Sequence, residues 1–445
     1  MTGKTMADEN MADETTPGGT TPGASAGTTP PPATLFERAQ VFDGTRFLDG
    51  PQDVLVRGDR VVAVGRELAD TDAAAGATRV DLRGRTLLPG FIDCHVHLMS
   101  SHVGSPQAFT DPFSAQFYAS VENARTTLGL GITTAREAGG ADKGLRLAIA
   151  SGAIPGPRLR LAITMMSQTG GHGDMRLDSG HTLPFLEEHR GRPSGIADGA
   201  EECRRVARRI LRAGADQIKI ASTGGVLSPS DDPHWSQFTI DEITAIVEEA
   251  AAQDKYVMAH AIGRQGILNA LRGGVRSIEH GIYLDDECLE LMVERGAYLT
   301  PTLVAPLFVI WDAEKGLPVP AQTLEKAKRV TAEHREACAR AIDAGVRIIF
   351  GSDAGVGPHG LNLRELALLA DAGMSLEQVL AAATSTAASL LGEEDSLGVV
   401  RPGTLADLVV LDEQLTSTGQ LEGLADHVVA VWQGGRQTHR KEGQR

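Results

Sequence analysis

Residues 87–98 read LLPGFIDCHVHL, an apolar run that carries two histidines two positions apart near its end. In a β-strand this spacing points both side chains to the same face, so the imidazoles of His95 and His97 can reach one point. Imidazole nitrogen is a common ligand for zinc and related cations. Because two hydrogen-bonded core histidines would give the same pattern, the rest of the chain has to decide between these interpretations.

Further apolar runs in the chain also carry an ionisable residue near their ends. These runs are DQIKIAS, YVMAHA, RSIEHG and RIIFGSDAG. Each predicts a buried strand, and a buried ionisable group lowers stability unless it is paired or binds a cation. We therefore predict that these residues converge with the histidine pair and hold metal ions, the full set being His95, His97, Lys219, His260, His280 and Asp353.

The central part of the chain alternates between predicted strands and predicted helices. Segments such as EECRRVARRILRAG have apolar residues three and four positions apart, which is typical of amphipathic helices. Thr239 and Glu242 have the spacing of a capping box at a helix start. We predict strands near residues 91–97, 131–135, 158–163, 216–221, 256–260, 276–280, 297–302 and 347–352.

This alternation predicts an α/β fold, a (β/α)₈ TIM barrel over residues 89–397. In such a barrel the carboxyl ends of the strands meet at one face, which is where the candidate ligands fall. A doubly wound open sheet is the alternative, but the sequence contains neither GxGxxG nor GxxxxGK[ST].

The two ends of the chain have a different character. Residues 34–88 and 398–440 contain short apolar or alternating runs broken by Gly and Asp, which predicts strands. We expect them to pair into one small, discontinuous β-sandwich domain. Residues 1–33 are rich in Thr, Pro, Gly and acidic residues and cannot bury enough apolar surface to order, so we predict a disordered tail.

Composition excludes several classes of partner. The formal net charge is −16, which argues against nucleic acid and anionic membranes. We find no apolar run long enough for a transmembrane helix and no apolar stretch typical of a secretory signal, so we expect a cytoplasmic protein. The four cysteines are far apart, without a CxxC pair, so neither a disulfide framework nor a cysteine zinc site is expected.

Lys219 has a specific chemical meaning if it lies in a metal site. It stands between Ile218 and Ile220, and a buried ammonium tends to lose its proton. A neutral amine can react with CO₂ to form a carbamate whose two oxygens can bridge two divalent cations. Without the other ligands, a lysine held in a salt bridge would be the preferred interpretation. Zinc is the first candidate metal, although manganese or cobalt would fit the same ligands.

The complete set of residues resembles the amidohydrolase superfamily over about residues 34–440. Within it, LLPGFIDCHVHL, TTAREAGG, SQTGGHGD, KIASTGGVLSP, AHAIG, SIEHGIYLDDE and GSDAG are similar to the imidazolonepropionase-related branch. That branch includes prolidases (Xaa-Pro dipeptidases), carboxypeptidases acting on N-acyl amino acids, and ochratoxinase-like amidases. Imidazolonepropionase itself lacks the bridging lysine, so the presence of Lys219 points to the members with two metal ions.

The resemblance implies a mechanism and names further residues. A hydroxide that bridges the metal ions would attack the carbonyl carbon of a C-terminal amide in a dipeptide or N-acyl amino acid, and Asp353 would carry its proton to the leaving nitrogen. His172 and Tyr283 are candidates for holding the substrate or its carbonyl oxygen; ordering a loop and packing are their respective alternatives. Arg136 is a candidate for binding a substrate carboxylate, and pairing with a neighbouring carboxylate is the alternative.

Two other functions remain open. The same barrel could open a cyclic amide of the imidazolone or lactam type, since only the shape of the pocket would differ. A non-catalytic scaffold is a remote third possibility, because such a protein would be expected to lose ligands and here all six are present. The expected partner is a small amide or dipeptide; assembly into a homo-oligomer is left open.

Overall fold

The computed structural model describes residues 32–101, 110–174, 180, 182, 186–228 and 231–441. The predicted disordered tail, residues 1–33, lies outside these residues except for its last two. Ala33 already begins the first strand, β1.

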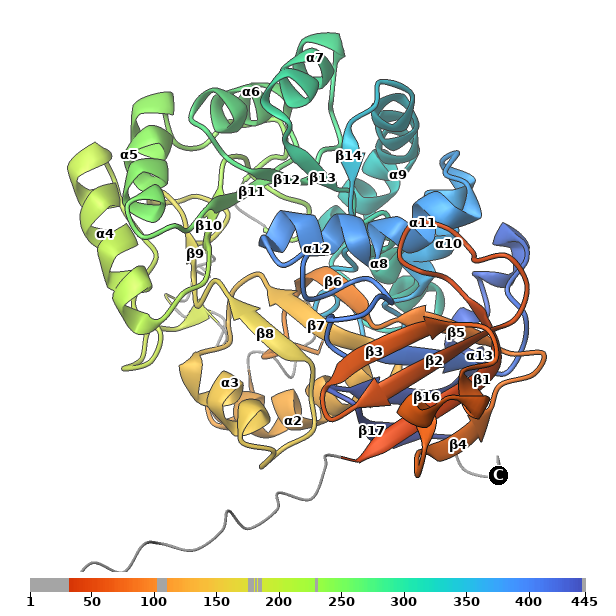
Figure 1. Cartoon of the computed structure of the whole chain (residues 1–445). Helices are drawn as coiled ribbons and strands as arrows, with labels where there is room; N and C mark the ends of the chain where they lie inside the picture. Colours follow the sequence, from red (N-terminus) through yellow and green to blue (C-terminus); the bar gives the residue numbers. More distant parts are fainter. Residues whose placement is uncertain are drawn as a thin grey trace, which may run out of the picture.

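Parallel strands form the barrel, and they coincide with all eight strands predicted from the sequence (Figure 1). They form a six-stranded sheet and a three-stranded sheet in which each strand lies beside its neighbour in sequence. The six-stranded sheet includes a short extra strand, β9, which pairs with β10. The barrel strands are β6 (Phe91–Val96), β7 (Ile132–Glu137), β8 (Arg158–Leu161), β9 (Met165–Met166), β10 (Ile218–Ala221), β11 (Val257–Ala261), β12 (Ser277–His280), β13 (Tyr298–Thr300) and β14 (Arg347–Ile348).

Backbone hydrogen bonds between the two sheets close the barrel. The amide of Cys94 in β6 donates to the carbonyl oxygen of Phe350 at 2.9 Å, and the amide of Asp353 donates to His95 at 2.7 Å. On the other side, the amide of Asp216 donates to Leu161 in β8 at 2.7 Å. The first and last segments of the barrel are therefore neighbours, which confirms the TIM-barrel prediction.

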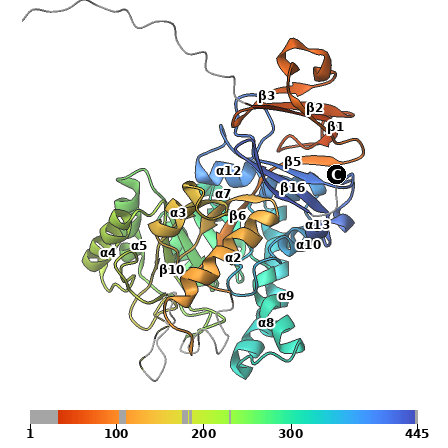
Figure 2. The ribbon, with the colours of Figure 1, turned by 90° about the horizontal axis from the view of Figure 1, so that it is seen from below.

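Helices surround these strands, and their apolar faces pack into one large core with the outer faces of the strands. The capping box predicted at Thr239 is present at the start of α5. α8 and α9 extend from the barrel on the side away from the β-domain (Figure 2). The helices are α2 (Ala115–Gly129), α3 (Lys143–Ala150), α4 (Ala200–Ala213), α5 (Ile240–Ala251), α6 (Arg264–Arg272), α7 (Asp286–Arg295), α8 (Val304–Glu314), α9 (Ala321–Asp343), α10 (Arg364–Asp371), α11 (Leu376–Ala382), α12 (Ser385–Leu391) and α13 (Leu424–His427).

Strands from both ends of the chain form the second domain, as predicted. β5 and β15 run antiparallel, with Leu88 opposite Val409, so this pair joins the two halves. The sheet has eight strands in the order β17-β16-β15-β5-β1-β2-β3, with β4 beside β1. The strands are β1 (Ala33–Val41), β2 (Gln52–Arg57), β3 (Arg60–Gly65), β4 (Thr78–Asp81), β5 (Thr86–Pro89), β15 (Leu408–Leu411), β16 (Val428–Gln433) and β17 (Arg436–Arg440).

A bulge in β1 bends this sheet over its own core. Arg38 has a φ of 62°, and the pairing of β1 with β2 shifts register between Phe36 and Ala39. Beyond the bulge, β1 pairs with β5. The two halves then face each other, and the rings of Phe36 and Trp432 meet edge to face at 4.9 Å. The sandwich-like core therefore arises from one continuous, bent sheet.

The β-domain lies against the barrel through specific polar contacts. Arg158 of β8 forms an ion pair with Asp407, and the side-chain amide of Gln433 donates to the carbonyl oxygen of Thr133 at 2.9 Å. Within the described residues, no helix combines the length and apolar character needed to cross a membrane.

Candidate active site

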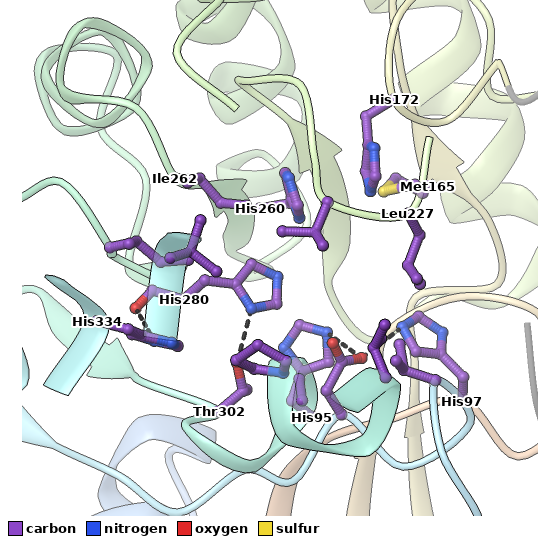
Figure 3. A pocket seen from close by; sticks show the side chains of 18 of the residues that line it. His95, His97, Met165, His172, Leu227, His260, Ile262, His280, Thr302 and His334 are labelled. Atoms are coloured by element: carbon purple, nitrogen blue, oxygen red, sulfur yellow. Dashed lines mark hydrogen bonds and ion pairs between the residues drawn. The ribbon is translucent and has the colours of Figure 1, made fainter. Parts of the chain in front are cut away.

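One pocket at the carboxyl ends of the barrel strands contains all six residues predicted to bind metal. Figure 3 shows the four histidines among them around this pocket. They come from segments that lie up to 258 residues apart in sequence, between His95 and Asp353, and the barrel brings them together. We call these six side chains, His95, His97, Lys219, His260, His280 and Asp353, the polar floor of the pocket.

The strand geometry explains why these side chains point inward. Cys94 packs outward in a cluster with residues of α12, so His95 on the same strand faces the interior. At the end of β12, His280 has a φ of 73°. This left-handed residue interrupts the alternation of faces, which lets both Glu279 and His280 reach the interior. Asp353 also has a positive φ, 54°, a conformation that Asp tolerates better than most residues.

His97 and His280 each turn one ring nitrogen to a neutral acceptor. Nδ1 of His97 lies 2.7 Å from the carbonyl oxygen of Gly139, so Nδ1 carries the proton. Nδ1 of His280 lies 2.7 Å from Oγ1 of Thr302, whose hydroxyl donates to the carbonyl oxygen of Pro301 at 2.6 Å. Thr302 must therefore accept from His280. Both histidines keep the lone pair of Nε2 on the other side of the ring.

His260 is oriented in the opposite way, and His95 has a charged partner. Nε2 of His260 lies 3.0 Å from the carbonyl oxygen of Gly224, so Nε2 is the donor and Nδ1 holds the lone pair. Nδ1 of His95 lies 2.8 Å from Oε2 of Glu279. An ionised carboxylate accepts only, which places the proton on Nδ1 and leaves Nε2 as the ligand atom of His95.

Arg136 holds Glu279 in place and does not line the pocket. Its Nη2 donates to both carboxylate oxygens of Glu279 at 2.9 Å, its Nη1 to Ser277 at 2.8 Å, and its Nε to the carbonyl oxygen of Cys94 at 2.6 Å. The side chains of Arg136 and Glu279 are fully buried. Binding of a substrate carboxylate by Arg136 is therefore wrong for this structure. The alternative, pairing with a carboxylate, is present, and Glu279 is the partner.

Lys219 lies in the centre of the polar floor. It is 1% exposed, and its Nζ lies 3.2 Å from Nε2 of His95. Burial lowers the pKa of this amine to about 8, although Glu279 and Asp353 act in the opposite direction. Burial also lowers the pKa of His95, His260 and His280 well below their ordinary range. Neutral imidazoles and an easily deprotonated amine are the forms that can bind a cation or CO₂.

The ligand atoms of His95, His97 and Asp353 fit a divalent cation, because they lie within 4.8 Å of one another. Oδ1 of Asp353 is 3.5 Å from Nε2 of His95 and 3.4 Å from Nε2 of His97. Burial raises the pKa of Asp353, but these histidines and Lys219 outweigh it and hold that pKa below its usual value. His260 and His280 lie on another side of the pocket, with ring centroids 4.6 Å apart.

Apolar side chains enclose the remaining sides of the pocket. Most of them come from the segment after β10, from the residues that follow β11 and β12, and from α8 and α9; one comes from β9 and one from the segment after β14. Ile262, Ile282 and Val330 pack together in one cluster, with Val226 and Tyr283 against it. We call the apolar residues that line the pocket the apolar wall: Met165, Val226, Leu227, Ile262, Ile282, Ala305, Pro306, Val309, Val330 and Val356.

The other two predicted substrate residues, His172 and Tyr283, have different positions. His172 lines the pocket and stacks on His260 with ring centroids 4.2 Å apart (Figure 3). Its Nδ1 lies 3.4 Å from Oδ2 of Asp231. Tyr283 does not line the pocket; its ring stacks on His234 at 4.1 Å and packs against the apolar cluster. In this structure Tyr283 has the packing role, because its ring is held between the loop and the cluster.

Several site residues were not predicted from the sequence. Glu279 precedes His280 in the apolar run SIEHG, and a carboxylate inside such a run is a detectable signal. Asp231 and His334 carry no such signal, because only the packing of a loop brings Asp231 beside His172, and only the packing of α9 brings His334 to the pocket. His334 uses Nε2 to donate to the carbonyl oxygens of His280 and Pro301, at 3.1 and 2.7 Å.

Comparison with known proteins identifies the family. The model of the amidohydrolase family matches residues 86–438. This chain belongs to the amidohydrolase family. The amidohydrolase is 33% identical to the ochratoxinase of Aspergillus niger over 402 residues, which cover 86% of this chain and 82% of that protein. It is a metal-dependent enzyme that acts on carbon–nitrogen bonds.

Solved structures of the same fold are similar along nearly the whole amidohydrolase. A prolidase complexed with N-methylphosphonate-L-proline is 35% identical, with a TM-score of 0.84, over 92% of this chain and 100% of that chain. A Xaa-Pro dipeptidase with bound methionine in the active site is 30% identical, with a TM-score of 0.82 and the same coverage of both chains.

Proposed function

We propose that this amidohydrolase cleaves the C-terminal amide bond of N-acyl amino acids or dipeptides, ochratoxin-type amides included, with two divalent cations. The observation that carries the proposal is the convergence of the six residues of the polar floor in one pocket. The relatives support it, since ochratoxinase and a prolidase are among the proteins most similar to this chain.

The polar floor offers ligands for both cations. His95, His97 and Asp353 would hold the first, His260 and His280 the second, and Lys219 would lie between them. When bound, such cations lower the pKa of a water molecule and polarise a carbonyl oxygen. Zinc is the first candidate, because these are the nitrogen and oxygen ligands that it takes.

We further propose that Lys219 is carboxylated. Its neutral amine nitrogen forms a bond to the carbon of CO₂ and releases one proton, which gives a carbamate with one negative charge and two oxygens. Burial at 1% exposure beside Nε2 of His95 supports this assignment, because a free ammonium in that position would repel cations.

Asp353 and His172 would carry out the proton transfer and the positioning. The Asp353 carboxylate accepts a proton from the attacking water and delivers it to the leaving nitrogen. His172, stacked on His260, holds the polar end of the substrate. The apolar wall binds the apolar part of the substrate and excludes water from the reacting amide.

A hydrolysis panel run beside elemental analysis tests the proposal. The panel contains N-acyl amino acids, Xaa-Pro and other dipeptides, lactams and hydantoins. We expect hydrolysis of the open-chain amides and about two metal ions per chain. The variant Lys219→Ala should be inactive and should hold about half of the metal.

The other outcomes discriminate between the remaining functions. Activity on rings alone would replace our assignment with a cyclic amide hydrolase. Full activity of Lys219→Ala would refute the role of the carbamate. A metal-loaded protein that hydrolysed no amide at all would favour a non-catalytic scaffold.

A further inference from the structure

Lys326 of α9 connects this helix to the segment that follows β10. The side chain is 6% exposed, and its Nζ donates to the carbonyl oxygens of Gly225 at 3.3 Å, Ser228 at 3.0 Å and Asp231 at 2.6 Å. An ammonium has three N–H donors, and here each has an acceptor. Because a buried ammonium is destabilising unless its donors are satisfied, the helix and this segment hold each other in place. We call residues 225–228 and 231 the anchored segment.

The anchored segment carries part of the apolar wall. Val226 and Leu227 line the pocket directly after Gly225. A Cβ atom on Gly225 would lie 2.1 Å from Cε1 of His172, so only glycine lets this imidazole pack against the segment. A displacement of the segment would therefore move the apolar wall and remove the surface on which His172 rests.

Asp231 extends the connection to the polar end of the pocket. Its Oδ1 accepts from the amide of Gly225 at 3.1 Å, and its Oδ2 lies 3.4 Å from Nδ1 of His172. The backbone of Asp231 is the acceptor closest to Lys326. Lys326 thus acts on His172 through Asp231. It binds the backbone of Asp231, and the carboxylate of Asp231 orients the imidazole.

The face of α9 that carries Lys326 also contributes residues that line the pocket. Val330 and His334 follow Lys326 at intervals of four residues, so the three side chains lie along one stripe of the helix. Val330 belongs to the apolar wall, and His334 binds the carbonyl oxygen of His280. Lys326 therefore sets the distance between α9 and the anchored segment, which line the same pocket from two sides.

From these contacts we infer that Lys326 is a positioning residue that determines substrate selectivity. It holds Val226 and Leu227 against an apolar group of the substrate and, through Asp231, keeps His172 at the polar end. The inference rests on the proposed function and narrows it to amides that carry a bulky apolar group. Lys326 itself does not line the pocket, so its effect on substrates is indirect.

The zinc-loaded variant Lys326→Met tests this role against Lys328→Met. Lys328 lies on the same helix, but its side chain is 54% exposed and its nearest acid, Glu325, is 4.0 Å away. The substrates are N-acetylglycine, N-acetylphenylalanine and N-benzoylglycine. For Lys326→Met we expect KM for the two bulky substrates to rise about tenfold, with a smaller change in kcat and in the rates for N-acetylglycine. Lys328→Met should behave as the wild type.

Hydrogen exchange gives a readout that needs no substrate. In Lys326→Met the amides of residues 224–228 and 231–238 should exchange faster, while those of β6 and β10 and the metal content stay unchanged. If Lys326→Met is poorly folded, Lys326→Arg retains the cation, but its planar fork cannot direct three donors to these carbonyl oxygens, so we expect the same loss of selectivity.

The outcomes separate the inference from the proposed function. Unchanged exchange in residues 224–228 and 231–238, or unchanged selectivity in either variant, would overturn the role of Lys326. A wild type that binds zinc but hydrolyses none of the three substrates would refute the proposed substrates. In that case the hydrogen-exchange measurement alone would show whether Lys326 holds the anchored segment in place.

Discussion

The polar floor and the apolar wall enclose the same pocket but are held by different interactions. The six floor residues stand in barrel strands or shortly after them, and hydrogen bonds or ion pairs fix each imidazole, as Glu279 fixes His95. The wall comes from loops and helices and is held by apolar packing, with Lys326 as its polar anchor. The register of a barrel allows the floor little movement, whereas a packed wall can change shape at a smaller energetic cost. The floor should therefore determine whether the reaction occurs, and the wall which substrate reacts.

The largest effect is expected from Asp353→Asn in the floor. Asn also tolerates the φ of 54° at this position, so the variant removes the charge without straining the backbone. Loss of the proton acceptor and of a ligand should lower kcat/KM by about 10³-fold for every substrate alike. Steady-state kinetics on bulky and small N-acyl amino acids measure this. A fall in kcat/KM for bulky substrates alone would contradict the claim that the polar floor acts on the reaction and the apolar wall on the choice of substrate.

The next largest effect, on the affinity for zinc, is expected when the buried ion pair between Arg136 and Glu279 beside His95 is removed. In the double variant Arg136→Met with Glu279→Gln both charges disappear together, so no unpaired ion stays buried. Without the carboxylate on Nδ1, His95 should be a weaker ligand, and the affinity for one of two zinc equivalents should fall by about 10–100-fold. Competition with a chromophoric chelator measures both equivalents separately.

The pair between Arg160 and Glu393 provides the matched control. Here too an arginine binds both oxygens of a glutamate, at 2.6 Å, but away from the pocket. Glu393→Gln should leave both zinc affinities unchanged. Equal weakening in the control and in the double variant would mean that general destabilisation, rather than the orientation of His95, explains the result.

The floor could be predicted from the sequence because strand ends of a barrel meet by geometry. His95, His97 and Lys219 needed only the alternation of faces and the position of an apolar run. The same rule misassigned Arg136, because it predicts which strand carries a residue but not how deep in the barrel its side chain lies. Glu279 was missed although its carboxylate stands out in an apolar run, because strict alternation would place it on the opposite face from His280, and the sequence does not reveal the left-handed φ of His280 that lets both reach the interior.

The wall could not be predicted because its contacts depend on how distant elements pack. Lys326 and its acceptor Gly225 are 101 residues apart, and no periodic pattern relates them. Tyr283 follows a floor residue closely in sequence, yet the loop that carries His234 holds its ring outside the pocket.

Within the wall, Val330→Ala should reduce selectivity without affecting the chemistry. The side chain is fully buried on α9, and the loss of its two methyl groups should lower the free energy of unfolding by about 2 kcal/mol. The kcat/KM for bulky substrates should fall by about fivefold and that for N-acetylglycine should not change. Val379→Ala in α11, equally buried but outside the pocket, should show the stability loss alone. Identical selectivity in both variants would contradict a wall that contacts the substrate.

The smallest effect on activity is expected from Thr239→Ala, at the other end of the loop that contains the anchored segment. The Thr239 hydroxyl accepts from the amide of Glu242 at 3.3 Å in the capping box of α5. Loss of such a cap lowers the free energy of unfolding by about 1 kcal/mol, which a denaturant titration detects. If Lys326 holds the wall, selectivity and zinc affinity should stay at their wild-type values, because its three acceptors remain in place. A selectivity change as large as that of Lys326→Met would show instead that the wall depends on the whole loop, and the lysine would lose its special role.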